Sequence, residues 1–185
     1  MMPKTILTAA VAALIAMTPT LELRAETRPQ VGSKAPEFTL RTLDGEPVGL
    51  AAMLERGPVV LIQLRGWVGY QCPICTAQVG EFMGRIEDFR AAGANIIAVY
   101  PGQEAEVQQY AEEFVAGKAI PGNFHFVLDP GLVFTNLYGL RWDAPNETAY
   151  PATFLIDPGG TVRFAKISRT HGGRAGAEEI LALLR

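Results

Sequence analysis

Apolar and polar residues alternate with two different periods along residues 31–185, which indicates short strands that alternate with helices. Residues 58–64, PVVLIQL, form an unbroken apolar and β-branched run that is typical of a strand buried on both faces. The same kind of pattern predicts four further strands, at residues 95–100, 124–128, 151–156 and 162–167.

A small hairpin is predicted ahead of the first buried strand, because Asp44-Gly45 is a strong two-residue turn signal. Helices are predicted where apolar side chains recur at three- and four-residue steps, at residues 50–54, 104–115, 132–138 and 177–184. Another helix begins at the first cysteine, and its apolar face comprises Cys75, Val79, Phe82, Ile86 and Phe89. We expect this helix to continue as far as Gly93, a typical helix stop.

This order of elements predicts an α/β fold with a central mixed β-sheet flanked by helices. A hairpin comes first, then three strand–helix units, then a second hairpin and a final helix. Strand–helix units favour a parallel sheet covered by helices, and the hairpins add antiparallel strands, the first as an N-terminal β-hairpin extension. The length of 185 residues fits one domain, which we assign to residues 26–185.

The first 25 residues differ from the rest of the chain. Lys4 precedes an apolar run over residues 6–17, and Ala25 ends the segment with a small side chain, an order typical of a secretory signal peptide. The run is shorter than the ~20 residues that span a bilayer, and no other segment of the sequence is long enough, so we expect no membrane span after its removal. An uncleaved N-terminal anchor is the alternative. The predicted location is the bacterial periplasm or another exported site, where disulfides persist.

Composition and charge exclude several classes of protein. Hydrophobic residues make up 49% of the chain and charged residues 19%, which excludes a disordered polar chain. The 16 basic and 19 acidic residues give a net charge of −3, so no nucleic-acid partner is expected. No nicotinamide or flavin fingerprint is present, and no cofactor is expected.

The two cysteines carry the candidate chemistry. Cys72 and Cys75 follow the buried strand at 58–64 and start a helix, so they lie one turn apart on the same face. Unpaired N–H groups at a helix start stabilise a thiolate, and Pro73 suits the first helical position. We expect Cys72 to be the exposed nucleophile and Cys75 the shielded thiol that attacks a mixed disulfide at Cys72.

Three other roles for the cysteine pair are weaker. A structural disulfide across so small a loop would contribute only about 2 kcal/mol. A zinc site would need further ligands, and His125 and His171 are not spaced as a motif, so no metal is expected. Inert core thiols are the third possibility. A redox couple that closes to a Cys72–Cys75 disulfide is favoured, because the C-x-x-C motif lies between a strand and a helix.

Three segments together resemble a known family. VGSKAPEF, residues 31–38, resembles the opening of redoxin domains, and the Cys-Pro-Ile-Cys motif resembles that of the thioredoxin superfamily. YPATFLIDPGG, residues 150–160, is similar to that superfamily's cis-proline strand and the turn after it. The best overall match is the peroxiredoxin-like AhpC/TSA branch. This resemblance implies a thioredoxin-like fold, a cis bond at Pro151 beside Cys72, and a substrate site that includes Tyr150 and Pro151.

The cysteine loop departs from the peroxiredoxin pattern. Peroxidatic cysteines of the family usually follow P-x-x-x-T/S-x-x-C, but here Arg65 stands at the proline position and Gly69 at the hydroxyl position. Arg65 leads straight to Cys72, so it is the first candidate for a cation that lowers the thiol pKa or orients a substrate, ahead of Arg141 and Arg174.

Other thiol-exchange families provide two further contrasts. Gln71 replaces the Trp that usually precedes the first cysteine of reductive thioredoxins. Gln78 stands where membrane-anchored thiol reductases often carry Glu. Trp67 and Tyr70 are candidates for aromatic walls of the site, with Trp67 placed among the substrate-binding residues.

The predicted function is that of an exported antioxidant or disulfide-exchange oxidoreductase that uses the Cys72–Cys75 couple. Its substrate would be a peroxide or a disulfide, and a thiol reductant would recycle it. The alternative is a copper chaperone with Cys72, Cys75 and His171 as ligands, although related redoxin-fold chaperones have one more residue between the cysteines. A binding module with an unreactive Cys72 is a second alternative.

Overall fold

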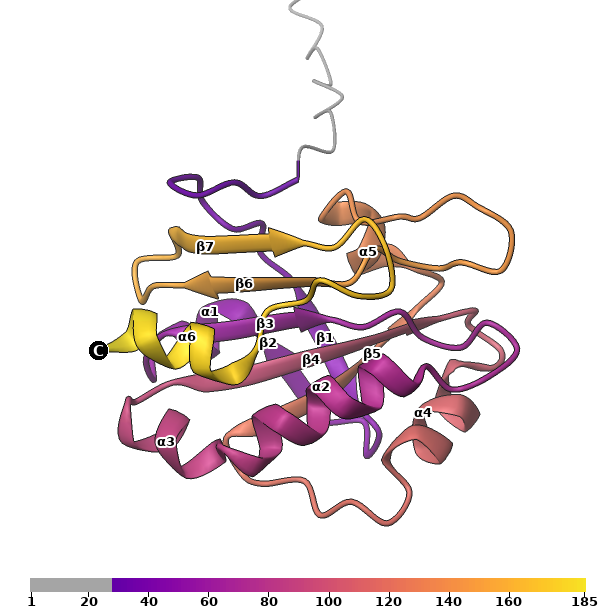
Figure 1. Ribbon diagram of the computed structural model, residues 1–185, viewed down its shortest axis with the longest axis horizontal. Helices are drawn as coiled ribbons and strands as arrows, with labels where there is room; N and C mark the ends of the chain where they lie inside the picture. The colour runs from indigo at the N-terminus through magenta and orange to yellow at the C-terminus, as the bar shows by residue number, and fades with distance from the viewer. Residues whose placement is uncertain (1–27) are drawn as a thin grey trace, which may run out of the picture.

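A seven-stranded mixed sheet forms the centre of the molecule (Figure 1). The computed structural model describes residues 28–185, so the predicted signal peptide lies outside the described residues. The strands are β1 (Thr39–Thr42), β2 (Pro47–Gly49), β3 (Val59–Gln63), β4 (Asn95–Gly102), β5 (Phe124–Pro130), β6 (Ala152–Ile156) and β7 (Val162–Ile167). Their order across the sheet is β2-β1-β5-β4-β3-β6-β7.

Parallel strands occupy the middle of the sheet and hairpins occupy its two edges. β3 and β5 both pair with β4 in parallel, whereas β6 lies antiparallel to β3 and continues into β7. At the other edge β1 and β2 form the predicted N-terminal hairpin, and β1 pairs antiparallel with β5. The prediction of a mixed sheet with an N-terminal hairpin is therefore confirmed.

Helices cover both faces of the sheet (Figure 1). They are α1 (Leu50–Leu54), α2 (Pro73–Gly84), α3 (Ile86–Ala91), α4 (Val107–Val115), α5 (Val133–Leu137) and α6 (Ala177–Leu184). Alternate residues of each strand point to opposite faces, so Val60 and Ile62 of β3 join the core under α2, α3, α4 and α6. Val59 and Leu61 join the core under α1 and α5. No helix within residues 28–185 combines the length and apolar character needed to cross a membrane.

The helix after the cysteines is interrupted, which the sequence pattern did not predict. α2 ends at Gly84, and α3 starts after Arg85, whose φ of −111° and ψ of 20° are not helical. Glycine is a poor helix former, and the Arg85 side chain binds Asp88 and Glu178. The apolar spacing still works across the break, because Phe82 and Phe89 both lie in the same core cluster. The expectation of one helix as far as Gly93 was wrong.

Two glycines shape the loop that leads from β3 to the cysteines. Gly66 has a φ of +76°, and a Cβ atom there would lie 2.1 Å from the carbonyl oxygen of Pro101 at the end of β4. Gly69 has a φ of +98°, a conformation that L side chains rarely adopt. The loop therefore needs glycine where the family pattern has a hydroxyl residue, and the backbone explains why no threonine stands there.

Candidate active site

Cys72 caps the N-terminus of α2. Its φ of −70° and ψ of 111° are extended, and its Sγ accepts a hydrogen bond of 3.4 Å from the backbone N–H of Cys75. Pro73 occupies the first turn, where its missing N–H group leaves no bond unmade. The sulfur thus takes the place of a capping oxygen, next to the positive end of the helix dipole.

Both sulfurs are buried, which corrects the expectation that Cys72 is exposed. The two thiols are unpaired, and the relative exposure is 3% for Cys72 and 1% for Cys75. The cause is the packing of the helix start into the main core, where both cysteines share a cluster with Leu64, Val79 and Tyr100. A large substrate therefore cannot contact Cys72 without movement of the surrounding chain.

Arg174 is the cation beside the sulfurs. It lies in the loop between β7 and α6, 102 residues after Cys72 in the sequence. Its Nη1 lies 3.1 Å from the Sγ of Cys75 and its Nη2 lies 3.6 Å from the Sγ of Cys72. Its Nε donates to the carbonyl oxygen of His171 at 2.9 Å, which fixes the base of the guanidinium.

These contacts separate the pKa values of the two thiols. A hydrogen bond from the Cys75 thiol, with smaller contributions from backbone N–H groups and Arg174, outweighs burial and lowers the pKa of Cys72 to about 5. The same hydrogen bond to Cys72, together with burial, raises the pKa of Cys75 well above its usual value. At neutral pH the pair therefore holds a thiolate at Cys72 and a proton at Cys75.

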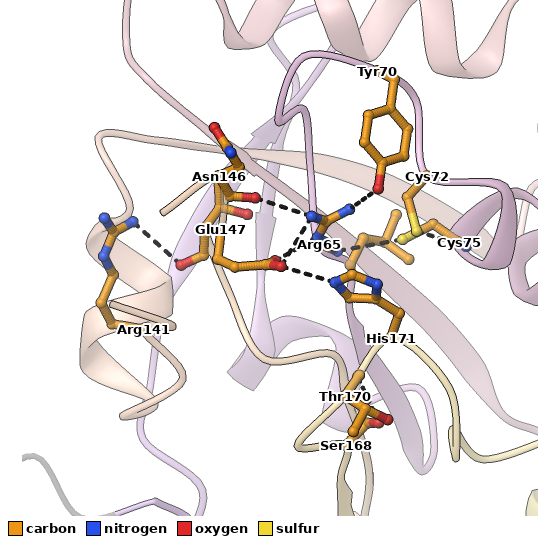
Figure 2. Close-up of polar contacts among 12 residues, drawn as sticks. Arg65, Tyr70, Cys72, Cys75, Arg141, Asn146, Glu147, Ser168, Thr170 and His171 are labelled. Carbon is orange, nitrogen blue, oxygen red and sulfur yellow. Dashed lines mark hydrogen bonds and ion pairs between the residues drawn. The ribbon is translucent and has the colours of Figure 1, made fainter. Parts of the chain in front are cut away.

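Arg65, the first candidate for the cation, points its guanidinium elsewhere (Figure 2). Two of its nitrogens bind the carboxylate of Glu147, at 2.5 and 3.0 Å. The third nitrogen, Nη1, donates to the hydroxyl of Tyr70, and Nη2 donates also to the carbonyl oxygen of Asn146, each at 2.9 Å. Only the backbone N–H of Arg65 reaches a sulfur, that of Cys75, at 3.4 Å. The positive charge of Arg65 is therefore paired with the carboxylate of Glu147 and not with the thiols.

Glu147 joins the cysteine loop to the loop that carries Arg174. Its carboxylate binds Arg65 and also lies 2.8 Å from the Nε2 of His171 (Figure 2). Burial alone would raise the pKa of Glu147, but the hydrogen bonds from Arg65 and His171 hold that pKa below its usual value. Sequence reasoning missed Glu147, because it lies in an irregular segment that has no periodicity. Arg141, the third candidate cation, donates to the carbonyl oxygen of Thr148 at 3.2 Å.

The copper alternative finds no support in this arrangement. His171, its required third ligand, is bound to Glu147. Within the part of the chain that the structure describes, no group of three His, Cys, Asp or Glu side chains is placed to hold a metal ion.

Pro151 is not a cis proline. Every peptide bond within residues 28–185 is trans, and trans is the lower-energy form. The N–H of Tyr150 donates to Leu140 and the carbonyl oxygen of Pro151 accepts from Ser168, each at 2.8 Å, so the chain is extended as it enters β6. The ring of Tyr150 stacks on Trp142 at 4.8 Å. A substrate contact for Tyr150 and Pro151 stays a prediction.

Trp67 borders a hollow next to the cysteine loop. Its ring stacks on that of Tyr110 with centroids 4.1 Å apart. The hollow, about 170 Å³, is lined by these rings and by Tyr100, Glu147 and others, but by neither cysteine. Trp67 therefore lines a hollow that does not include the thiols, and its predicted substrate contact remains a prediction.

Comparisons with known proteins agree with the geometry. The model of the AhpC/TSA family matches residues 31–165. A Mycobacterium tuberculosis protein named as a peroxiredoxin is 33% identical over 145 residues, which cover 76% of this chain and 86% of that protein. Chloroplastic peroxiredoxin Q of Oryza sativa subsp. japonica is 28% identical over 133 residues, 72% of this chain, and the match spans 57% of that relative's length.

A solved structure shows the same fold. The crystal structure of peroxidoxin BcpB from Mycobacterium tuberculosis superposes with a TM-score of 0.66 at 21% identity, covering 85% of this chain and 97% of that chain. The shared fold and the extent of the family match confirm the resemblance inferred from the sequence. The chain is a member of the AhpC/TSA family and has the thioredoxin-like fold of peroxiredoxins.

Proposed function

We propose that this protein is an exported thiol peroxidase that reduces peroxides with the Cys72–Cys75 couple. The observation that carries the proposal is the pair of sulfurs at the start of α2, one stabilised as a thiolate and the other kept protonated, with Arg174 touching both. Membership of a family with peroxiredoxin-named relatives supports the same chemistry. Export rests on the predicted signal peptide at residues 1–25.

In the first step, the Cys72 thiolate attacks one oxygen of the peroxide. The S–O bond forms as the O–O bond breaks, so the sulfur is oxidised to a sulfenic acid and the other oxygen leaves with the electron pair. The leaving oxygen takes the proton of Cys75 and departs as water or an alcohol. Arg174, 3.6 Å from the Cys72 sulfur, stabilises the thiolate and the negative charge that develops on the leaving oxygen.

In the second step, Cys75 resolves the sulfenic acid. Having lost its proton, the Cys75 thiolate attacks the Cys72 sulfur and expels hydroxide, which solvent protonates to water. The product is the Cys72–Cys75 disulfide. Two electrons from an external thiol reductant then restore both thiols, because the chain supplies no electrons of its own.

Burial favours a small oxidant over a protein disulfide as the substrate. Cys72 as a residue is only 3% exposed, a burial that hinders a molecule as small as hydrogen peroxide less than a disulfide of a folded partner, which must approach the sulfur in line. Disulfide exchange with a large substrate would require the cysteine loop to move first. The absence of the family's hydroxyl residue at Gly69 leaves Arg174 and the helix start as the groups that orient the peroxide.

Stopped-flow kinetics of the reduced protein test the proposal, with hydrogen peroxide and a disulfide peptide as separate oxidants. We expect fast peroxide consumption that Cys72→Ser abolishes. Cys75→Ser should retain the first turnover and accumulate a sulfenic acid, which dimedone traps. Slow reaction with peroxide and fast reaction with the peptide would make the protein a thiol–disulfide oxidoreductase instead.

A further inference from the structure

Gln78 contacts Arg174 from the second turn of α2. The Gln78 side chain is buried, at 6% exposure, and its Oε1 accepts a hydrogen bond of 3.1 Å from Nη1 of Arg174. Its Nε2 donates to the carbonyl oxygen of Ala175 at 3.2 Å and to the hydroxyl of Thr153 at 3.4 Å. The amide is therefore fixed on both sides, and only one orientation offers the oxygen to the arginine.

The charge of Arg174 is left for the sulfurs. Within residues 28–185 no ion pair joins Arg174 to a carboxylate. Its polar partners are the two sulfurs, the Gln78 amide oxygen and the carbonyl oxygen of His171. Neither of these two oxygens carries a formal charge. A carboxylate in the place of the Gln78 amide would pair with the guanidinium, as Glu147 does with Arg65.

We propose that Gln78 is a positioning residue, whose neutral amide holds Arg174 across both sulfurs and leaves the positive charge of the arginine to them. The inference rests on the proposed function only for the use of the resulting thiolate, which is attack on a peroxide. Arg174 touches the reacting atoms, whereas Gln78 acts through Arg174.

The same arrangement serves both halves of the cycle. When the disulfide forms, Arg174 loses its anionic partner at Cys72, but its bonds to Gln78 and to the carbonyl oxygen of His171 do not depend on the redox state of the sulfurs. The guanidinium therefore stays in place until reduction restores the thiolate. No repositioning of a long side chain is then needed in each turnover.

Few other ionisable groups lie close enough to the two sulfurs to change their charge. From β4, Tyr100 lies within electrostatic range of both thiols, and burial raises its pKa, so it is neutral. From the cysteine loop, Arg65 presents only its backbone N–H. From α2, Cys75 itself is protonated. A charge placed at position 78 therefore acts mainly on Arg174 and through it on Cys72.

The test compares Gln78→Glu and Gln78→Met with the control Gln30→Glu, which makes the same charge change at an exposed site. The titration of Cys72 is followed in the reduced full-length protein, by ultraviolet absorbance of the thiolate and by alkylation with iodoacetamide across pH. We expect Gln78→Glu to raise the midpoint by about one pH unit, a tenfold loss of thiolate on the acid side. Gln78→Met should raise it by less, and Gln30→Glu should not move it.

Peroxide consumption across pH separates positioning from a merely structural role. The deficit of Gln78→Glu should be greatest below neutral pH and should disappear at alkaline pH, where Cys72 is ionised in every variant. A loss that is uniform across pH, or an unmoved midpoint, overturns the inference. If Gln78→Glu does not fold, the midpoint of Gln78→Met decides alone. A shifted midpoint in a protein that ignores peroxide supports the inference and contradicts the proposed function.

Discussion

Arg65 and Arg174 approach the same two cysteines from loops far apart in the chain, and they end in different surroundings. The side chain of Arg65 is 3% exposed and its charge is matched by Glu147, which is 10% exposed. Arg174 has two sulfurs and neutral oxygens for partners. An arginine whose charge is paired with a carboxylate, which we call compensated, ties loops together. An arginine without a carboxylate partner, which we call uncompensated, changes the acidity of the thiols beside it. The difference separates the scaffold of the site from its chemistry.

The largest effect is expected from breaking the compensated pair. Glu147→Ala would leave the guanidinium of Arg65 buried without a counter-charge, which typically costs about 3–5 kcal/mol of unfolding free energy. Urea denaturation measures the loss. The control is Glu87→Ala, which removes a surface pair with Arg90 whose side chains are 73% and 55% exposed, and which should cost less than about 1 kcal/mol. Equal losses in the two variants would refute the contrast between the arginines.

Removing the uncompensated charge should alter reactivity more than stability. In the wild-type protein, thiolate reactivity should be lost as the pH falls through about 5, the lowered pKa of Cys72. Arg174→Gln withdraws a stabilising cation, so the pKa rises and the loss begins at a higher pH. At mildly acidic pH we expect a rate of peroxide consumption about tenfold lower.

The control for that variant is Arg169→Gln, an exposed arginine in the same loop, which should keep the wild-type pH profile. A pH profile of Arg174→Gln that overlaps the wild-type one would show that Arg174 contributes nothing to the thiolate. Urea denaturation of the same samples checks that both variants are folded.

The smallest effect on the rate of peroxide consumption is expected from a change in the loop that carries Arg65. Gly69→Thr restores the hydroxyl of the family pattern, but at a φ of +98° the new side chain should cost about 1–3 kcal/mol. The peroxide rate should not rise, because Arg174 and the start of α2 already provide the groups that orient the peroxide in the proposed mechanism. Gly69→Val introduces a β-branched side chain of the same shape without the hydroxyl, so the two variants should match in stability and rate. A faster Gly69→Thr would show that the site lacks a group that the family uses.

Much of the fold was predictable because its determinants are local. The run at 58–64 became β3, buried on both faces, and Asp44-Gly45 became the turn between β1 and β2. The break at Arg85 was not predictable from apolar spacing, since Phe82 and Phe89 reach the same core on either side of it.

The site was predictable only in part. The position of the cysteines at a helix start follows from the C-x-x-C motif and its proline. The choice between Arg65 and Arg174 does not follow from the motif. It depends on how the loop after β7 packs against α2, and Arg174 in that loop is 99 residues away from Cys75 in the sequence. Proximity along the chain favoured Arg65, and the distant Glu147 took its charge. The signal peptide and export remain predictions.

The burial of both sulfurs has a kinetic consequence for turnover. Under the proposed function, a peroxide would have to reach Cys72, which is 3% exposed, and a protein reductant would have to reach a disulfide at the same buried position. Recycling by such a reductant would require the first turn of α2 or the neighbouring loop to open, so the opening frequency would limit turnover at high reductant concentration. We then expect peroxide consumption to show a rapid first turnover followed by a slower steady state, with the proposed turnover dependent on the local stability of a single helical turn.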